Sequence, residues 1–439
     1  MRNERIVNSA AYLTWVLALV CALASGCGGQ SRFASGSVDT SFGTRGVTRV
    51  SLGFAPPGHH SALVRESDGG LVVAGSACPT PDIRCGTAVV ARFDGNGSLD
   101  RHFGSAGRAY VHVGRDAYIS GMAVERGGRI VLAGSSTRPG SYRRRFILVG
   151  LRANGSVDRS FGVAGRAMTQ LGWHSVINAF SLTAGGQFVV AGTILDRRLT
   201  RAQIALARYS ADGRVDPTFG QQGTVTTSLG AGAGTKALTI TPNGQLIVAA
   251  ERVLSNRNHA FALVRYRANG QRDPRFGNRG VVVGALRAFS YPAALIQQGA
   301  GRVVMIGVTE SGAGRPRLMT RRYNAVGRLD TNFPARSVVN ITGAHDLEVD
   351  AATSTNSRNY AVAGTATSAD GRVEWIVLWR FRSNGSPDPS FGEAGVVQLP
   401  VPVGTSVYNL VSQPNGALLL ASVESTRTGP ALTLRRFRP

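Results

Sequence analysis

Arginine residues accompanied by aromatic residues are the side chains of this sequence best suited to bind a ligand. They fall in segments that vary in length and composition, between stretches that recur almost unchanged. Guanidinium groups match carboxylate and phosphate groups, and aromatic faces suit sugar rings. The pattern predicts a binding site for an anionic ligand. The candidate residues are Tyr142, Arg143, Arg144, Arg145, Trp173, Arg197, Arg198, Arg201, Phe289, Tyr291, Arg315 and Arg317.

The formal net charge of +24 invites a nucleic-acid interpretation. Lys236 is the only lysine, however, and the arginines are spread along the chain instead of forming blocks. Such a skew reflects genomic base composition as readily as function. We therefore do not expect nucleic acid as a partner. The alternative for the candidate arginines is a solvated face that only keeps the protein soluble.

One phrase with an aspartate, a Phe-Gly pair and a second glycine recurs along the chain. Its phenylalanines lie 57 to 61 residues apart, a regularity that chance does not produce. The sixth copy, LDTNFPARS, lacks both glycines, so we expect its turn to differ. The repeated pairs are Asp39 and Phe42, Asp100 and Phe103, Asp158 and Phe161, Asp216 and Phe219, Asp273 and Phe276, Asp330 and Phe333, and Asp388 and Phe391.

Each repeat predicts four short β-strands. An apolar strand and a strand followed by an Asn-Gly or Asp-Gly turn keep step with the Phe-Gly phrase. In the first full repeat we expect strands near residues 62–65, 71–75, 89–93 and 107–113. Four-stranded antiparallel units repeated radially predict an all-β fold, a seven-bladed β-propeller over residues 28–439. A solenoid is the alternative, but its repeats are usually shorter.

The two ends of the repeat region predict ring closure. Residues 46–52 would supply the outer strand of the last blade, which is formed by residues 405–437, so that two sheet edges become paired. We expect each repeated aspartate to accept N–H bonds in a tight turn and each phenylalanine to fill a seam between blades. Arginines are placed to pair with the aspartates: Arg92, Arg152, Arg208, Arg265, Arg322, Arg380 and Arg436.

Residues 1–27 have the pattern of an export signal. Two arginines precede an apolar run over residues 11–24, and small residues lead to Cys27. The small residues resemble a bacterial lipoprotein box, although Ala24 stands where leucine is usual. We expect a lipidated Cys27 and a cell-envelope lipoprotein, in the outer membrane or periplasm. A secreted protein with a signal cleaved nearby is the alternative.

Cys78 and Cys85 form the remaining cysteine pair. In an oxidising compartment we expect a disulfide between them. A metal site is the alternative, but two thiolates without a nearby histidine make only half a zinc site.

Common catalytic patterns are absent from the sequence. The histidines form no HExxH pair, there is no GxSxG phrase, and Gly230–Lys236 lacks the P-loop spacing. The expected inner strands carry few acids, namely Glu66, Glu125, Glu348 and Asp350. We therefore expect no catalytic residues, no metal and no cofactor. A hydrolase or dehydrogenase with a site at the mouth of the propeller channel is the alternative.

The LDxxFGxxG phrase at this spacing resembles the delta-60 repeat family over about residues 31–439. That family comprises exported bacterial proteins predicted to form propellers, and it has no established activity. The resemblance implies an exported propeller and assigns no catalytic residue. The leading interpretation is a monomeric, non-enzymatic binding scaffold that contacts the membrane only through its anchor. An anionic envelope glycan, a lipid phosphate or an acidic protein would be its partner.

Overall fold

The computed structural model describes residues 34–50, 61–77, 86–137, 140–230, 232–255, 258–284, 290–310, 316–334, 341, 343–355, 358–426 and 429–439. These residues contain β-strands and no α-helix, which confirms the all-β prediction. In this part of the chain there is accordingly no helix of the length and apolarity needed to span a membrane. Residues 34–439 form one compact unit.

Four sheets have four strands each. They contain β2 (Ser61–Arg65), β3 (Leu71–Ala77), β4 (Thr87–Phe93) and β5 (Arg108–His112); β14 (Gly232–Ile240), β15 (Leu246–Ser255), β16 (Asn258–Tyr266) and β17 (Val281–Val283); β21 (Ala344–Ser354), β22 (Tyr360–Ser368), β23 (Glu374–Phe381) and β24 (Val396–Val401); and β25 (Ser406–Ser412), β26 (Leu418–Thr426), β27 (Gly429–Phe437) and β1 (Val47–Val50). In the first sheet the predicted strand bounds hold to within two residues.

Two further sheets depart from this number of strands. The eight-stranded sheet contains β6 (Arg115–Val124), β7 (Ile130–Thr137), β8 (Arg144–Leu151), β9 (Arg166–Thr169), β10 (His174–Leu182), β11 (Phe188–Leu195), β12 (Ala202–Tyr209) and β13 (Thr224–Thr227). Its halves are joined by one parallel pairing, between Arg144 and His174. The three-stranded sheet contains β18 (Ser290–Gln298), β19 (Arg302–Glu310) and β20 (Pro316–Tyr323). Residues 335–340, where its fourth strand would fall, lie outside the described residues.

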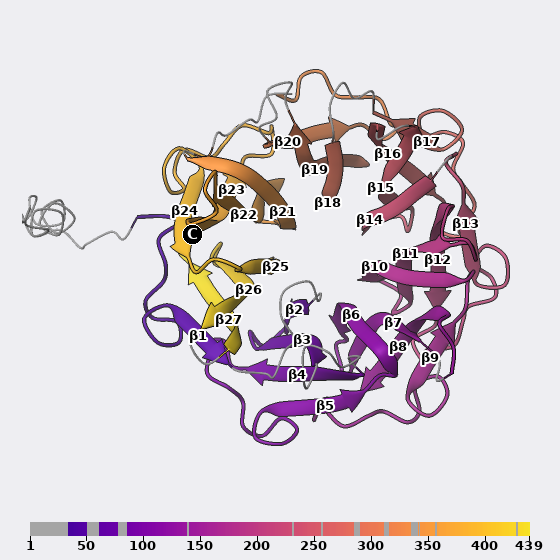
Figure 1. Cartoon of the computed structure of the whole chain (residues 1–439), viewed down its shortest axis with the longest axis horizontal. Coiled ribbons are helices and arrows are strands. Elements are labelled where there is room, and N and C mark those ends of the chain that lie inside the picture. The colour runs from indigo at the N-terminus through magenta and orange to yellow at the C-terminus, as the bar shows by residue number, and fades with distance from the viewer. Residues whose placement is uncertain are drawn as a thin grey trace, which may run out of the picture. The chain divides into compact units, whose positions relative to one another are not determined.

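The sheets of residues 34–439 stand around a common centre (Figure 1). The strands nearest the centre are β2, β6, β10, β14, β18, β21 and β25. Each contacts the next in this order, and β25 contacts β2. The described chain is therefore a β-propeller.

The N-terminal strand completes the last sheet. β1 pairs antiparallel with β27, with Val47 opposite Arg435 and Val50 opposite Leu432, which confirms the predicted pairing. Glu424 is buried there and forms ion pairs with Arg435 and, at 3.4 Å, with Arg49 of β1. Because two guanidinium groups face this carboxylate, its charge is balanced inside the joint.

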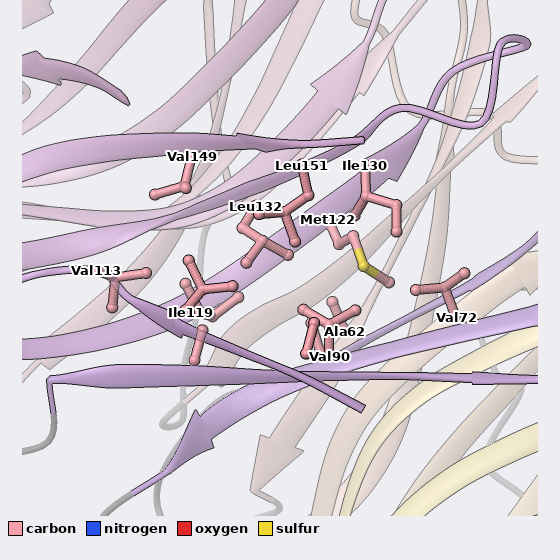
Figure 2. Close-up of a cluster of buried hydrophobic side chains, with 14 of the residues drawn as sticks. Ala62, Val72, Val90, Val113, Ile119, Met122, Ile130, Leu132, Val149 and Leu151 are labelled. Atoms are coloured by element: carbon pink, nitrogen blue, oxygen red, sulfur yellow. The ribbon is translucent and has the colours of Figure 1, made fainter. Parts of the chain in front are cut away.

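The hydrophobic core is divided among the seams between adjacent sheets. In one seam, Val72 and Val90 face Leu132 and Val149 of the next sheet (Figure 2). Each repeated phenylalanine is buried in a cluster that joins two neighbouring sheets or, for Phe161, the two halves of the eight-stranded sheet, as predicted from the repeat. The seven are Phe42, Phe103, Phe161, Phe219, Phe276, Phe333 and Phe391.

Each of these rings also packs against a turn glycine of the following repeat. Gly213 has a φ of +80°, and a Cβ atom on it would lie 2.7 Å from the Phe161 ring. The backbone joins the same two repeats, because the Gly162 N–H donates to the Asp212 carbonyl at 2.6 Å. The turn glycine thus supplies both a left-handed backbone and room for the ring.

The start of the described unit provides the turn for the last repeat. Gly36 has a φ of +82°, and a Cβ atom on it would lie 3.2 Å from the Phe391 ring. The Gly392 N–H donates to the Ser35 carbonyl at 3.0 Å. The contact that joins successive repeats is therefore also made between the two ends of this unit.

An arginine–aspartate ion pair accompanies most of the phenylalanines. Arg208 lies 2.8 Å from Asp216, and its guanidinium carbon is 4.8 Å from the Phe219 ring centroid. Asp216 also accepts hydrogen bonds from the backbone and hydroxyl of Thr218, as expected of a turn aspartate. The predicted pairing is confirmed in five repeats at 2.7–2.9 Å: Arg436–Asp39, Arg208–Asp216, Arg265–Asp273, Arg322–Asp330 and Arg380–Asp388.

Two repeats differ because a glutamate directly follows the first strand: the predicted ion pair is longer in one repeat and replaced in the other. Arg92 is 2.8 Å from Glu66 and 3.8 Å from Asp100. In the next repeat the pairing of Arg152 with Asp158 was wrong: Arg129, held by Glu125, lies 3.8 Å from Asp158 instead.

The sixth copy of the phrase is described only as far as Pro334, so most of its predicted different turn lies outside the described residues. Pro334 stands in place of the first glycine and has no N–H to donate to the next repeat.

The contact between ring and glycine can be tested with Gly213→Ala. We expect a loss of roughly 2–4 kcal/mol in the free energy of unfolding, from positive φ and from overlap with Phe161. Gly371→Ala is the matched control, because Gly371 has a φ of +69° and open space around it. The control should lose about 1–2 kcal/mol of its free energy of unfolding, measured by denaturant titration. Equal losses in the two variants would contradict the packing role.

Candidate functional site

Bulges in the central strands place one side chain from most sheets at the same level. The pairing of first and second strand shifts by one residue at the same repeat position in β6, β10, β14, β18, β21 and β25. The inserted residues are Ser120, Asn178, Lys236, Ala293, Asp350 and Tyr408. Because adjacent sheets cover both sheet faces, the exposed surface of these residues opens toward the centre. Bulges commonly re-aim side chains beside functional sites.

The residue before the bulge is bound to the preceding sheet at two seams, and to the preceding half of the eight-stranded sheet at a third. Its N–H donates to a hydroxyl group at 2.9–3.0 Å: Ile119 to Ser76, Ile177 to Ser135 and Thr235 to Thr193. At the next seam, Pro292 has no N–H to donate, and Glu251 stands at the position of these three hydroxyl groups. The Glu251 carboxylate instead lies 3.1 Å from the Lys236 ammonium.

Tyr291 lies between this ion pair and the acidic side chains of β21. The Lys236 Nζ is 5.8 Å from the centroid of the Tyr291 ring. Burial raises the pKa of the phenol, and the charges of Glu348 and Asp350 raise it further. We name Lys236, Glu251, Tyr291, Glu348 and Asp350 the central cluster.

Asp350 has the most unusual carboxyl of the central cluster. Asp350 is exposed at the surface, but the strands around it remove much of the hydration of its carboxyl group. This burial, together with the charge of Glu348, raises the pKa of Asp350 to about 8. Near neutral pH the cluster therefore contains a protonated carboxyl group beside Glu348.

Trp173 brings together two of the predicted arginines on the connecting loops. The guanidinium carbon of Arg143 is 4.4 Å from the Trp173 ring centroid, and that of Arg197 is 5.3 Å away. The three residues come from the β7–β8, β9–β10 and β11–β12 connections. We name Arg143, Trp173 and Arg197 the loop cluster. Cation–π attraction holds its two positive charges close together.

Local hydrogen bonds shape the loop that carries Arg197. The Asp196 carboxylate accepts from the backbone N–H of Thr200 at 2.8 Å and of Arg201 at 3.3 Å. Leu199 takes a φ of +57° inside this tight loop. Both guanidinium-bearing side chains of the loop cluster are exposed.

The other predicted site residues are dispersed. Arg144 packs on Tyr118 at 4.8 Å and donates to the Asp116 carbonyl at 2.9 Å, so its role is largely structural. Arg145 is half-buried. Exposed residues near the loop cluster in sequence are Tyr142, Arg198 and Arg201, whereas Arg317 is exposed on β20. Residues Phe289, Arg315, Cys27, Cys78 and Cys85 lie outside the described residues.

Two expectations about the aromatic residues need correction. Tyr291 does not belong to a basic face, because the acids of β21 and Glu251 surround it. Trp173 has guanidinium groups against its ring, which leaves little of it for stacking on a sugar.

Sequence reasoning missed Lys236 and Glu251 as functional candidates. Two signals pointed to them: Lys236 is the only lysine, and Glu251 is the one charged residue at a repeat position otherwise held by Ser, Thr or Val. Among the described residues, no group of three or more His, Cys, Asp or Glu side chains is placed to hold a metal ion.

Comparison with known proteins supports a propeller repeat of unknown function. The family model described as a domain of unknown function (DUF5122) beta-propeller matches residues 128–161, 183–219, 241–276 and 360–391. These segments begin near the second-strand turns and end at the repeated phenylalanines. No curated protein matches the chain.

Several solved structures resemble the chain at low identity. The β-propeller domain of the Trilobed protease from Pyrococcus furiosus is 10% identical, with 86% of this chain and 95% of that chain covered and a TM-score of 0.43. A glucose dehydrogenase is 12% identical over 88% and 98%, with a TM-score of 0.38. An exo-1,5-alpha-L-arabinanase from a bovine ruminal metagenomic library is 13% identical over 64% and 100%, with a TM-score of 0.33. Likeness at this level assigns no activity to the chain.

The environment of Asp350 can be tested by its titration. We expect NMR of the side-chain carboxyl to give a pKa near 8, well above the usual value of about 3.9. Glu348→Gln should lower this pKa, because it removes the neighbouring negative charge. A pKa near 4 in the unaltered protein would contradict the described environment.

Proposed function

We propose that the chain is an exported, non-enzymatic, seven-bladed propeller that binds an anionic partner through its loop cluster. The blade count takes each half of the eight-stranded sheet as one blade and β18–β20 as another. The family-model match supports a propeller repeat, and the seven copies of the repeated phrase support the count of seven. Lipidation of Cys27 and a place in the cell envelope are part of the proposal, and they rest on the sequence of residues 1–27.

The observation that carries the proposal is the pair of guanidinium groups on Trp173. Arg143 and Arg197 are exposed, and within the described ranges neither guanidinium group forms an ion pair with a carboxylate. Their N–H groups are thus available to carboxylate or phosphate oxygens. Trp173 limits the motion of both side chains, which reduces the entropy lost when a ligand binds.

An acidic envelope polysaccharide fits this arrangement best. Two fixed guanidinium groups can bind two acidic groups of one polymer at once, and such a polymer repeats them along its length. The net charge of +24 attracts polyanions over a longer range, and salt weakens this attraction. A lipid phosphate or an acidic protein would use the same guanidinium groups.

The proposal can be tested on an array of acidic glycans and envelope lipids at two salt concentrations. Arg143→Gln/Arg197→Gln should weaken binding by tenfold or more, because each charged hydrogen bond contributes roughly 1.5–3 kcal/mol. The matched control is Arg101→Gln/Arg159→Gln, which removes two exposed arginines from the Phe-Gly turns. The affinity of this control variant should stay within about twofold of that of the unaltered protein. Equal losses of affinity in both variants would show that the binding depends on net charge alone.

A hydrolase with its site at the central cluster is the second candidate. The observation in its favour is the raised pKa of Asp350 beside Glu348, since a protonated carboxyl next to a carboxylate suits general acid–base catalysis. Turnover of a glycoside or ester by the purified protein would favour this candidate over the binding scaffold.

A further inference from the structure

The central cluster contains the only lysine of a chain that otherwise uses arginine. The sequence has 49 lysine and arginine residues, and Lys236 is the single lysine among them. A guanidinium group is a broad, planar fork, whereas an ammonium group is a compact point charge with three donors. An ammonium group at this one position therefore suggests that its size and shape matter here.

The surroundings of this ammonium group resemble a receptor for an amine. The Lys236 Nζ lies 3.1 Å from the Glu251 carboxylate and 5.8 Å from the Tyr291 ring centroid. A carboxylate together with an aromatic face is the arrangement that proteins use to hold ammonium ligands. The Lys236 side chain is 39% exposed, so solvent and a small ligand can reach it.

The seam beside Tyr291 lacks a hydrogen bond that is present at three other seams. Where three other seams join a hydroxyl group to a backbone N–H, this one has Glu251 and Pro292. The partner of Glu251, Lys236, stands at a bulge where the other sheets carry Ser, Asn, Ala, Asp or Tyr.

Carboxyl groups outnumber the single ammonium group within the central cluster. The strands packed against it also carry Arg252 on β15, which donates to the Leu229 carbonyl, and Arg380 on β23, which pairs with Asp388. β14 contributes Lys236, β15 contributes Glu251, and β18 contributes Tyr291. β21 contributes three acids, and β23 contributes Glu374, whose raised pKa reflects burial first and then the charge of Glu348. The β21 acids are Asp346, Glu348 and Asp350. The cluster is thus negative within a protein that is positive overall.

We propose that the central cluster binds the primary ammonium group of a ligand, and that Lys236 occupies this subsite until the ligand displaces it. The ligand ammonium would donate to Glu251 and to the β21 carboxylates and would lie against the Tyr291 ring. Two sources carry this chemistry, a free diamine and the amino terminus of a peptide. The inference is independent of the loop cluster, which binds charge of the opposite sign.

The test is calorimetric titration of the full chain with three probes: putrescine, a tripeptide with a free amino terminus, and its N-acetylated form. We expect the free amines to bind and the acetylated tripeptide not to bind. Tighter binding of putrescine identifies a free diamine as the source, and tighter binding of the tripeptide identifies a peptide terminus. Equal binding of both tripeptides would overturn the proposal.

Four variants give the site a directional test. Lys236→Met should tighten amine binding by about tenfold, because it removes the competing ammonium. At pH 8.5, where Asp350 is largely ionised, Tyr291→Leu and Asp350→Asn should each weaken it by at least about fivefold. Arg143→Gln/Arg197→Gln should leave it unchanged, so the loop-cluster proposal can fail while this one stands. Unchanged or weaker binding by a folded Lys236→Met protein would overturn the proposal, and a merely unfolded variant cannot mimic tighter binding.

The affinity for putrescine should also depend on pH. Asp350 must release its proton to face an ammonium group, so binding should strengthen as the pH rises from 6 toward 8.5. Putrescine suits this range because ordinary alkyl amines, with a pKa of about 10, remain charged in it. In Asp350→Asn the rise should disappear. A constant affinity across this range in the unaltered protein would contradict the assigned part of Asp350.

Discussion

The packing of each repeated phenylalanine against the turn glycine of the next repeat is the contact on which the propeller depends. The ring fills the seam, the neighbouring glycine leaves room for it, and the backbone N–H after most of the rings binds the same turn. In five repeats an arginine–aspartate pair also lies on the ring. Gly36 and Phe391 make the same contact between the two ends of residues 34–439. The same local interaction therefore sets the spacing of the sheets and joins the two ends of residues 34–439.

This arrangement separates what holds the sheets together from what can bind a ligand. The Phe-Gly turns lie at one end of the sheets, and the connections that carry Arg143, Trp173 and Arg197 lie at the other. Those connections can vary without loss of the seams, so they are free to carry binding residues. The bulges do the same at the centre, where the flanking residues stay buried and the inserted residue changes from sheet to sheet.

The repeat made the strands predictable, but not the meeting of side chains from different sheets. Periodic spacing placed β2–β5 within two residues and predicted five arginine–aspartate pairs. It failed at Arg152, because Glu125 brings Arg129 to Asp158 instead. It wrongly assigned Tyr291 to a basic face, because the acids around this residue come from β21, more than fifty residues away in the sequence. A bulge inserts one residue without disturbing the apolar pattern, so the level shared by Lys236 and Asp350 could not be read from the sequence.

The most direct test of this account is a double-mutant cycle on Arg436 and Asp39, the ion pair that joins the two ends of the unit. Their side chains are 12% and 18% exposed and their nearest charged atoms are 2.7 Å apart, so we predict a coupling free energy of about 1–3 kcal/mol in equilibrium unfolding. Arg214 and Asp212, 81% and 52% exposed at 3.3 Å, are the control pair and should couple by no more than about 0.5 kcal/mol. Coupling of Arg436 with Asp39 as weak as that of the control pair would contradict the claim that the repeat contact closes the propeller.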